Sequence, residues 1–333
     1  MILKVYGNYS KAQIDAKLAT KQSILTPDDT LATINGTVVK YGADVSIKED
    51  VGEHQYIGSS VSLKKHTFNI TNLGTLPSTG ENRNGMAIYN GIMFSLSNKG
   101  ICSIFSIGDA SLTYINQYNL ASYADTNHAN TASFGFEKYD ASDEFPLLYI
   151  ARCYTGYRTC LVERVTRQSS QLVQTIGLGT YAGDVTSSSD IQWVVGDDGY
   201  LYMFGNTKAT FNASGNKFVV AKFDLPKLSA GSDVSLNLND AHYMYYMEDY
   251  GYKPNQVLQG CCIVNGMMFL PIGYGNSSSP SSLIVWDMDA RAIMTRINLS
   301  TLTSGEIEDV CEYNSMLYLR YGNGNTYKMD FVG

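Results

Sequence analysis

The feature that most constrains the fold of this chain is a β-hairpin pattern that returns along its length. In each regular copy two short apolar runs flank a tight turn, and a less regular copy joins 131–136 to 147–151. The regular copies are 86–89 with 92–97, 191–195 with 200–204, 261–264 with 267–272, and 310–313 with 316–321. Their turns are Asn90-Gly91, Gly196 to Gly199, Asn265-Gly266 and Asn314-Ser315. The interval between copies, roughly 50 to 67 residues, is typical of four-stranded propeller blades.

Further β-like runs follow each hairpin and complete this pattern. The pairs of runs are ICSIFSI with TYINQYNL, TCLVERV with LVQTIGL, FVVAKFDL with DVSLNL, and LIVWDM with IMTRINL. The last unit ends in TYKMDFVG and lacks an outer strand, whereas the run from Thr67 to Leu73 has no hairpin partner before it. We therefore predict an all-β, five-bladed propeller over 61–333, closed by this N-terminal strand, because closure removes an exposed sheet edge. A six-bladed ring is the alternative.

The first sixty residues differ from this pattern. Ser10 and Gln13 have capping-box spacing before a stretch rich in Ala, Lys, Gln and Leu, which predicts a short helix over about 11–22. Alternating apolar residues around Asn35-Gly36 predict a hairpin over about 30–47. The apolar stripe of the helix is thin and needs a partner. We expect residues 1–60 to be an attachment or oligomerisation segment.

Two motifs in this segment resemble bacteriophage tail fibres. YSKAQIDAKLATKQ is similar to a Y-[ST]-K-x-[EQ]-[IV]-D-x-x-[IL] pattern of those proteins, and TLATINGTVVKYGADVSI to the xIKTINGxSLLGxGxIxI segment that often follows it. The second departs from the pattern at Val38, Val39 and Tyr41. The resemblance implies a phage or prophage receptor-binding protein, commonly a trimer, that is assembled into a virion tail with other tail proteins.

A second resemblance covers the last two units. VLQGCCIVNGMMFLPIGYGN, LIVWDMDARAIMTRINL and GEIEDVCEYNSMLYLRYGNGNTYKMDF resemble a repeat found in phage tail and wall-teichoic-acid-related propellers. Glu308-Asp309-Val310 stands where that repeat has Glu-Gly after its acidic run. The resemblance supports the fold more than a particular activity.

Composition narrows the classes of partner. The net charge of −7 disfavours nucleic acid, because phosphate backbones attract basic surfaces. No apolar run reaches membrane-spanning length and no signal peptide is apparent, so we expect a chain made in the bacterial cytoplasm that does not insert into membranes. The six cysteines are expected to be reduced, with Cys153 and Cys160 left open as a pair across a hairpin. The four histidines and the Asp-Asp-Gly turn lack metal-site spacing, so we expect no metal and no cofactor.

Tyrosines provide the first candidate site. The chain has 25 Tyr, and many fall in connections expected on one face of the propeller, including the segment DAHYMYYMEDYGYKPN. Aromatic rings stack on the C–H faces of sugars, so this face is a candidate for binding a bacterial surface polysaccharide. Individually, each ring could instead fill a gap between blades. The candidate residues are Tyr154, Tyr157, Tyr243, Tyr245, Tyr246, Tyr250, Tyr252 and Tyr274.

Polar residues at the starts of the innermost strands provide the second candidate site. We expect them to ring the mouth of the central channel: Arg83, Asn84, His128, Asn130, Asp190, Gln259, Glu308 and Asp309. Three carboxylates at such a mouth serve as acid and base in five-bladed glycosidases, but amides occupy two of the five positions here. The sequence therefore favours non-catalytic binding of a cell-surface glycan. A structural or protein-interaction propeller of the tail is one alternative, and a polysaccharide-cleaving propeller is another.

Overall fold

The computed structural model describes residues 30–34, 37–40, 67–77, 83–154, 157–252, 257 and 259–332. The chain divides into two compact units, Met1–Phe68 with Phe331–Gly333, and Asn69–Asp330. In the first unit β1 (Thr30–Ile34) pairs antiparallel with β2 (Thr37–Lys40). The predicted helix over 11–22 and the rest of the predicted hairpin segment, 41–47, lie outside the described residues. Within the described ranges, no helix has the length and apolar character needed to cross a membrane.

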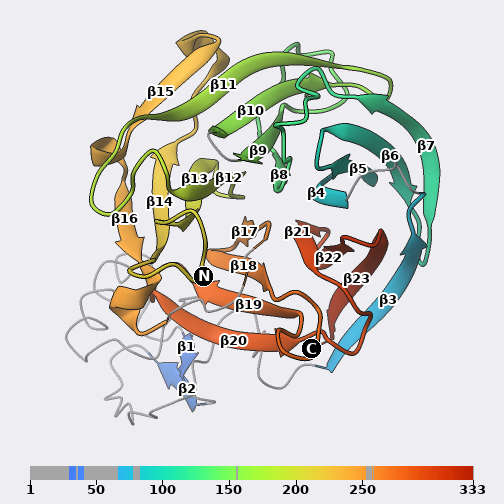
Figure 1. The fold of residues 1–333 in the computed structure, drawn as a ribbon. Helices are drawn as coiled ribbons and strands as arrows, with labels where there is room; N and C mark the ends of the chain where they lie inside the picture. Colours follow the sequence, from blue (N-terminus) through green and yellow to red (C-terminus); the bar gives the residue numbers. More distant parts are fainter. Residues whose placement is uncertain are drawn as a thin grey trace. The chain divides into compact units, whose positions relative to one another are not determined.

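The second unit is a five-bladed β-propeller, which confirms the five-bladed prediction over the six-bladed alternative (Figure 1). Each blade is one sheet whose first strand lies nearest the centre of the ring, and the first three strands of each blade pair antiparallel. Blade 1 consists of β4 (Arg83–Tyr89), β5 (Ile92–Ser97), β6 (Ile101–Ile107) and β7 (Leu112–Asn119). Blade 2 contains β8 (Ala132–Phe134), β9 (Leu148–Tyr154), β10 (Tyr157–Val165) and β11 (Ser170–Thr180), with β15 (Asp233–Asn237) as a fifth, parallel strand.

The other three blades each have four strands. Blade 3 consists of β12 (Asp190–Val195), β13 (Tyr200–Asn206), β14 (Phe218–Asp224) and β16 (Tyr243–Tyr246). Blade 4 consists of β17 (Cys262–Val264), β18 (Met267–Ile272), β19 (Ser282–Asp287) and β20 (Ala292–Asn298). Blade 5 consists of β21 (Ile307–Tyr313), β22 (Met316–Tyr321), β23 (Asn325–Val332) and β3 (Thr67–Thr75). Short 3-10 turns η2 (Leu228–Ala230), η3 (Leu238–Asp240) and η4 (Met247–Tyr250) lie in the connections around β15 and β16.

Turn chemistry explains why the first two strands of three blades form tight hairpins. Asn90 and Asn265 have φ of 47° and 52°, and the glycines after them have φ of 73° and 74°. Two successive positive φ values define the turn whose twist matches paired strands, and Asn-Gly adopts it at the lowest cost. Asn314 uses the same geometry with Ser315, at φ of 52° and 62°.

The ring closes as predicted, because β3 lies beside β23 in blade 5. The Leu76 amide N–H donates to the Gly324 carbonyl oxygen at 3.0 Å, just beyond the end of β3. Leu73 and Leu76 are buried at the seam between blades 5 and 1, where they pack in one cluster with Met86 and Tyr318. The strand from the start of the propeller sequence therefore completes the last blade.

One part of the predicted strand assignment is wrong. The run DVSLNL, expected to be the outer strand of blade 3, forms β15 and pairs in parallel with β11 of blade 2. Blade 3 is completed instead by β16, whose Tyr246 and Tyr243 pair with Val219 and Lys222 of β14. The segment around these tyrosines, expected to be a connection on the binding face, is therefore partly an edge strand.

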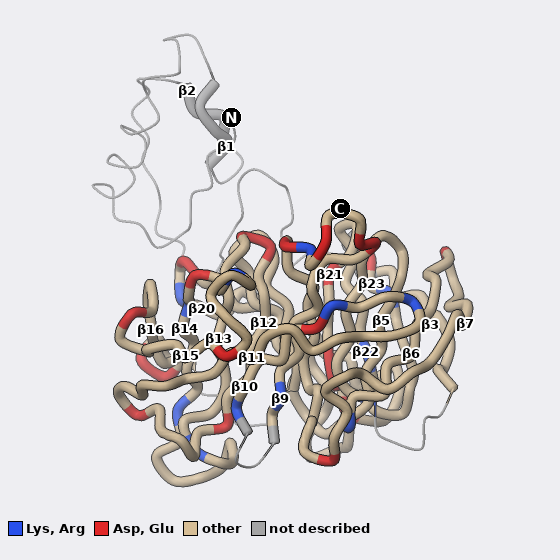
Figure 2. The backbone as a smooth tube through the Cα atoms, turned by 90° about the horizontal axis from the view of Figure 1, so that it is seen from above, with Lys and Arg blue, Asp and Glu red and all other residues tan. Residues whose placement is uncertain are grey.

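The core is a set of apolar layers between neighbouring blades. Trp193 is buried in the layer between blades 2 and 3, and Trp286 in the layer between blades 3 and 4. All six cysteines are among the described residues and all are free thiols. Across the β9–β10 hairpin Cys153 faces Arg158 and Cys160 faces Ala151, so the two thiols do not face each other. Charged residues are sparse: Figure 2 shows short segments of both signs separated by long uncharged stretches of the blades.

Candidate functional site

The tyrosines of the predicted glycan face do not gather on one surface. Tyr243, Tyr245, Tyr250 and Tyr252 lie at the seam between blades 3 and 4. Tyr245 is 4% exposed, and its hydroxyl oxygen accepts a hydrogen bond from Trp286 Nε1 at 2.9 Å. Burial raises the pKa of Tyr243 and of Tyr252 to about 12. These rings fill the gap between two blades, which was the alternative left open for each of them.

A cation occupies the outer side of this tyrosine cluster. The Arg291 guanidinium lies 4.9 Å from the centre of the Tyr245 ring and 5.1 Å from that of Tyr250. Arg291 also donates from Nη1 to the Tyr250 hydroxyl. Arg291 thus covers part of the cluster from within the chain, whereas Tyr250 keeps 43% of its surface exposed.

The remaining candidate tyrosines are dispersed. The Tyr246 hydroxyl accepts a hydrogen bond from the Asp184 N–H at 2.7 Å, in the connection between blades 2 and 3. Tyr274 is exposed in a connection of blade 4, with its ring 6.4 Å from that of Phe211. For Tyr154 and Tyr157 the structure describes the backbone, where they pair across the β9–β10 hairpin, but not the side chains.

The structure does bring several of the predicted channel-mouth residues together, but as a buried network. Asn84 Nδ2 donates to Asn130 Oδ1 at 3.1 Å, and Asn130 Nδ2 donates to Gln192 Oε1 at 2.9 Å. Thr131 Oγ1 donates to the same Gln192 oxygen at 2.8 Å. Both asparagines are 2% exposed. Sequence reasoning missed Gln192, although its position on the inner strand of blade 3 could have indicated it.

Asp309 is the centre of this end of the channel. Its Oδ2 accepts from the backbone N–H of Met86 at 2.7 Å and of Ala132 at 3.3 Å, and its Oδ1 accepts from the Val310 N–H at 2.9 Å. The side chain is fully buried, and burial raises its pKa while these hydrogen bonds act in the opposite direction. A Cβ atom at Gly260 would overlap the Asp309 carboxylate, so glycine is required there. Asp309 therefore joins the inner strands of blades 5, 1 and 2, beside blade 4.

The other predicted mouth residues are also engaged with neighbouring groups. Arg83 Nη1 donates to Ser103 Oγ at 3.0 Å, and burial lowers its pKa to about 10. Asp190 accepts from the Cys153 thiol at 3.2 Å. Burial also lowers the pKa of His128, which Asp190 partly offsets.

An acidic group lies around the start of β21. Gln259 Nε2 donates to Glu306 Oε1 at 2.5 Å. Burial and the nearby Glu306 and Asp309 carboxylates raise the pKa of Glu308. No set of three or more metal-ligating side chains positioned for an ion occurs among the described residues. This end of the channel is thus a plug of polar groups around Asp309, most of them hydrogen-bonded to one another or to the backbone, although the buried Asn84 Oδ1 has no partner in the described part of the chain.

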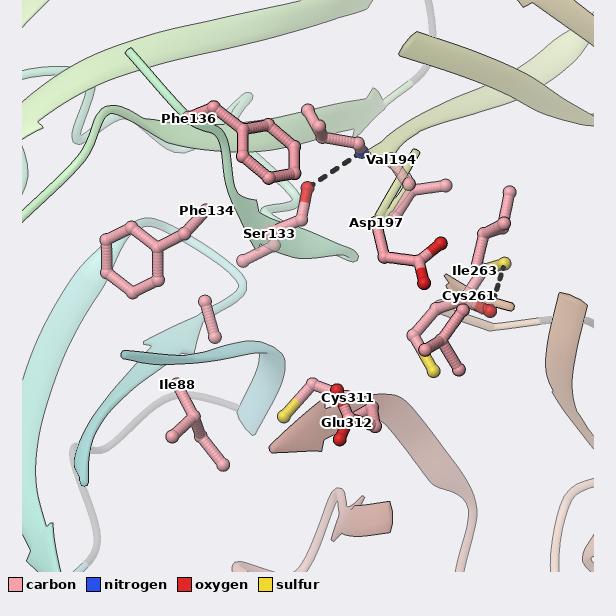
Figure 3. Close-up of a pocket in the computed structure, with 16 residues that line it drawn as sticks. Ile88, Ser133, Phe134, Phe136, Val194, Asp197, Cys261, Ile263, Cys311 and Glu312 are labelled. Carbon is pink, nitrogen blue, oxygen red and sulfur yellow. Dashed lines mark hydrogen bonds between the residues drawn. The ribbon is translucent and has the colours of Figure 1, made fainter. Parts of the chain in front are cut away.

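The open part of the channel lies at its other end, beside the hairpin turns. A cavity of about 140 Å³ is enclosed there by the far ends of the five inner strands (Figure 3). Its walls come from all five blades: Ala87 and Ile88, Ala132 to Phe134, Val194 and Val195, Cys261 to Val264, and Cys311. Gly196 and the side chains of Phe136, Asp197 and Glu312 complete the lining, and Figure 3 shows these three side chains around the same opening. None of these three residues was predicted as a site residue.

Phe136 is the most exposed aromatic ring in the described part of the chain, at 63%. It belongs to the connection between β8 and β9, which is much longer than the tight turns at the corresponding place in the other blades. That connection is held by Arg164, whose Nη2 donates to Asp143 Oδ1 at 2.6 Å, and by the Leu147 N–H, which donates to the Glu137 carbonyl oxygen at 2.8 Å. Its place at the rim of a cavity makes this ring a candidate ligand contact, because aromatic side chains with a few polar groups line most ligand pockets.

Two carboxylates share this opening with the ring. Asp197 Oδ2 accepts from the Asn265 N–H at 2.8 Å, and Glu312 Oε1 accepts from the Ser315 N–H. Each carboxylate keeps most of its acceptor capacity. The cavity thus combines an exposed ring, thiol and aliphatic walls, and two groups able to accept hydrogen bonds from hydroxyls or amines.

Comparisons with known proteins support no family assignment. No protein-family model matches the chain, and no curated protein matches it. Among solved structures, the tail fibre of Staphylococcus aureus phage P68 is similar over 82% of this chain and 54% of its own, with 11% identity and a TM-score of 0.49.

Enzymes are also found among the solved structures of similar fold. A virginiamycin B lyase from Staphylococcus aureus is similar over 80% of this chain and all of its own, with 12% identity and a TM-score of 0.40. A PQQ-bound aldose sugar dehydrogenase from Streptomyces coelicolor is similar over 79% and 98%, with 10% identity and a TM-score of 0.45. These values carry no function to this chain, and the propeller assignment rests on its own five sheets.

Proposed function

We propose that this chain binds a bacterial cell-surface glycan without cleaving it, as the receptor-binding part of a phage or prophage tail. The observation that carries the binding proposal is Phe136, an exposed ring held by an ordered loop at the rim of the central cavity. A sugar can lie with its C–H face on this ring while its hydroxyls donate to the carboxylates of Asp197 and Glu312. The tail setting rests on the two tail-fibre motifs in the first fifty residues.

The carboxylates at the plugged end of the channel do not favour hydrolysis. A general acid or base must reach the substrate, whereas Asp309 is fully buried and its two oxygens accept three backbone hydrogen bonds. Asp190 accepts from the Cys153 thiol and lies 3.9 Å from Arg158 Nε, and Glu308 is buried beside Gly322, the residue after β22. Binding therefore accounts for the geometry better than catalysis.

The test is binding of wall polysaccharides, purified from a panel of bacteria, to the wild-type chain and to Phe136→Ala. We expect at least about tenfold weaker binding in the variant, because a stacked ring contributes on the order of 1.4 kcal/mol or more. Tyr139→Ala is the matched control: Tyr139 lies in the same loop and is exposed, but its ring faces Arg164 and does not line the cavity.

The tail alternative gives a different result in the same experiment. If no polysaccharide binds and Phe136→Ala instead removes binding to a co-expressed tail protein, the propeller is a protein-interaction module. Release of reducing sugar ends that stops in Asp190→Asn and Glu308→Gln would establish the glycosidase alternative.

A further inference from the structure

We propose that the central cavity selects glycans that carry a primary ammonium group, and that it disfavours phosphate and carboxylate groups. This inference rests on the proposed function, because it names the class of glycan bound at the same site. It depends on the two negative charges around the cavity and on the absence of an ion-pair partner for either among the described residues.

The first observation is that the cavity is acidic without a compensating base. Its lining contains Asp197 and Glu312 but no Lys, Arg or His. Neither carboxylate forms an ion pair with any residue that the structure describes. A positively charged ligand group would therefore meet two negative charges that no side chain of the described chain neutralises.

The neighbouring aspartate shows the contrast. Asp198 forms an ion pair with Lys222 at 2.8 Å and also accepts from the Tyr202 hydroxyl at 2.7 Å. The Lys222 ammonium lies 3.8 Å from the centre of the Tyr200 ring. Lys222 thus forms its ion pair with Asp198 and not with Asp197. One carboxylate of the Asp-Asp-Gly turn stabilises the blade, and the other faces the cavity.

The second observation is that both cavity carboxylates are held in place. Asp197 on the turn of blade 3 accepts from the Asn265 N–H on the turn of blade 4, and Glu312 accepts from the Ser315 N–H in its own hairpin. Backbone N–H donors fix the direction of each carboxylate without neutralising its charge. The two negative charges are therefore preorganised for a ligand instead of being free to turn into solvent.

The third observation comes from a thiol in the wall of the cavity. Burial is the main cause that raises the pKa of Cys262, the charges of Cys261 and Asp309 add to it, and those of Glu312 and Asp197 contribute in the same direction. Both carboxylates thus act on one point inside the cavity, although they belong to different blades. Both carboxylates would repel an anion that enters there and attract a cation.

The ring at the rim suits the same ligand group. An ammonium over the face of an aromatic ring is attracted by the ring quadrupole, and Phe136 has no cation of the described chain over it. A cavity of about 140 Å³ is smaller than the roughly 300–1,000 Å³ of pockets that enclose whole ligands. It fits a substituent or terminal group, with the remainder of the polymer outside.

The experiment compares two ligands that differ in one charge. Binding of the full-length chain to a glucosamine tetrasaccharide and to its fully N-acetylated form is measured by calorimetry at low and high ionic strength. Alanine methyl ester is a third probe, which separates an amino sugar from an amino-acyl substituent as the source of the ammonium. We expect the free amine to bind on the order of tenfold tighter than the N-acetyl form, with a preference that declines as salt screens the charges.

Variants identify the residues responsible. Asp197→Asn and Glu312→Gln keep the shape of each side chain and an oxygen that can accept from the same backbone N–H. Each substitution should reduce the preference for the amine roughly threefold. Asp198→Asn is the matched control and should leave the preference unchanged. Thermal unfolding of each variant checks that the fold is retained.

The outcomes separate this inference from the proposed function. If the N-acetylated form binds as well as the free amine and Asp197→Asn has no effect, the ammonium proposal is overturned while glycan binding stands. If the wild-type chain binds neither the tetrasaccharides nor any wall polysaccharide, both the ammonium proposal and the proposed function are overturned. If Asp197→Asn and Asp198→Asn reduce the preference equally, the effect is one of general surface charge and the assignment to the cavity is wrong.

Discussion

At the residue scale, identical side chains have different roles that only the fold determines. The sequence marked Asp309 and Asp190 as equivalent members of a channel mouth, yet Asp309 accepts three backbone hydrogen bonds and Asp190 accepts from one thiol. The positions could be predicted because they follow from the start of each inner strand. The bonding could not, because it depends on bulges that shift the register of β4 and β21.

Asp309→Asn tests the role of the buried carboxylate. An amide offers one acceptor in place of two and directs its NH₂ group at backbone donors, so we expect the free energy of unfolding to fall by about 2–4 kcal/mol. Urea unfolding followed by tryptophan fluorescence measures it. Asp125→Asn, in an exposed ion pair with Lys99, should cost less than about 1 kcal/mol. Equal effects of the two substitutions would contradict the role assigned to Asp309.

Tyr245→Phe tests whether this tyrosine stabilises the seam between blades 3 and 4. Removing the hydroxyl leaves Trp286 Nε1 without its acceptor in a buried layer, so we expect a loss of about 1–3 kcal/mol with glycan binding unchanged. Tyr250→Phe, at an exposed ring, is the control. A large loss of binding with unchanged stability would return Tyr245 to the ligand site.

At the scale of elements, the sequence predicted every hairpin that local turn chemistry specifies and missed an exchange of outer strands. DVSLNL has the pattern of an outer strand and is one, but it pairs with β11 of blade 2. A signal for this pairing was present in β11: a Cβ atom at Gly179 would overlap Ser235, so glycine allows β15 to approach closely. Such a signal cannot be interpreted until the partner strand is known.

Two truncations test the strand that closes the ring. Removal of residues 1–76 deletes β3 together with the buried Leu73 and Leu76, and we expect it to destabilise the propeller by at least about 4 kcal/mol. The same truncation exposes the edge of β23, so size-exclusion chromatography should show association. Removal of residues 1–60 keeps β3 and should leave the unfolding temperature nearly unchanged. Equal stability of the two fragments would show that β3 is dispensable.

At the scale of the whole molecule, the two ends of the central channel differ. One end is filled by the network around Asp309, and the other holds the cavity beside the hairpin turns (Figure 3). The ring itself could be predicted from repeat spacing. Which end of the channel is open could not be predicted. The polar residues that fill the closed end are of the same types that line open propeller channels, and only their hydrogen bonds in the structure show that this end is closed.

Because its thiols are buried, we expect the free energy of unfolding of the propeller to fall at alkaline pH. Burial raises the pKa of all six cysteines above 9.0, to about 12 for Cys160, so the unfolded chain releases these protons first as the pH rises. Because a proton is then bound more tightly in the folded state, stability is full below pH 9 and is lost above it. Burial also raises the pKa of tyrosines, to about 12 for Tyr243, Tyr252 and Tyr318, which acts in the same direction as the thiols at higher pH. Burial lowers the pKa of Arg320 to about 9 and that of Arg83 to about 10, which acts in the opposite direction but involves fewer groups.

We expect the free energy of unfolding to be several kcal/mol lower at pH 10 than at pH 8. Urea unfolding at a series of pH values, with reductant present throughout, measures it. Cys160→Ser removes one titrating thiol and should reduce this difference by about 1.4 kcal/mol. A stability that stays constant to pH 10 would show that the thiols do not govern the alkaline limit.

The β15 strand has a consequence for how this protein could change by duplication or loss of repeats. Between β14 and β16 the chain leaves its own blade, adds a strand to the preceding one, and returns. Blades 2 and 3 are therefore interlocked, and neither can be excised or copied as a self-contained cassette without leaving the other incomplete. Recombination that inserts or removes single blades should be better tolerated at blades 1 and 4, each formed by one continuous stretch of chain, while blades 2 and 3 are inherited together.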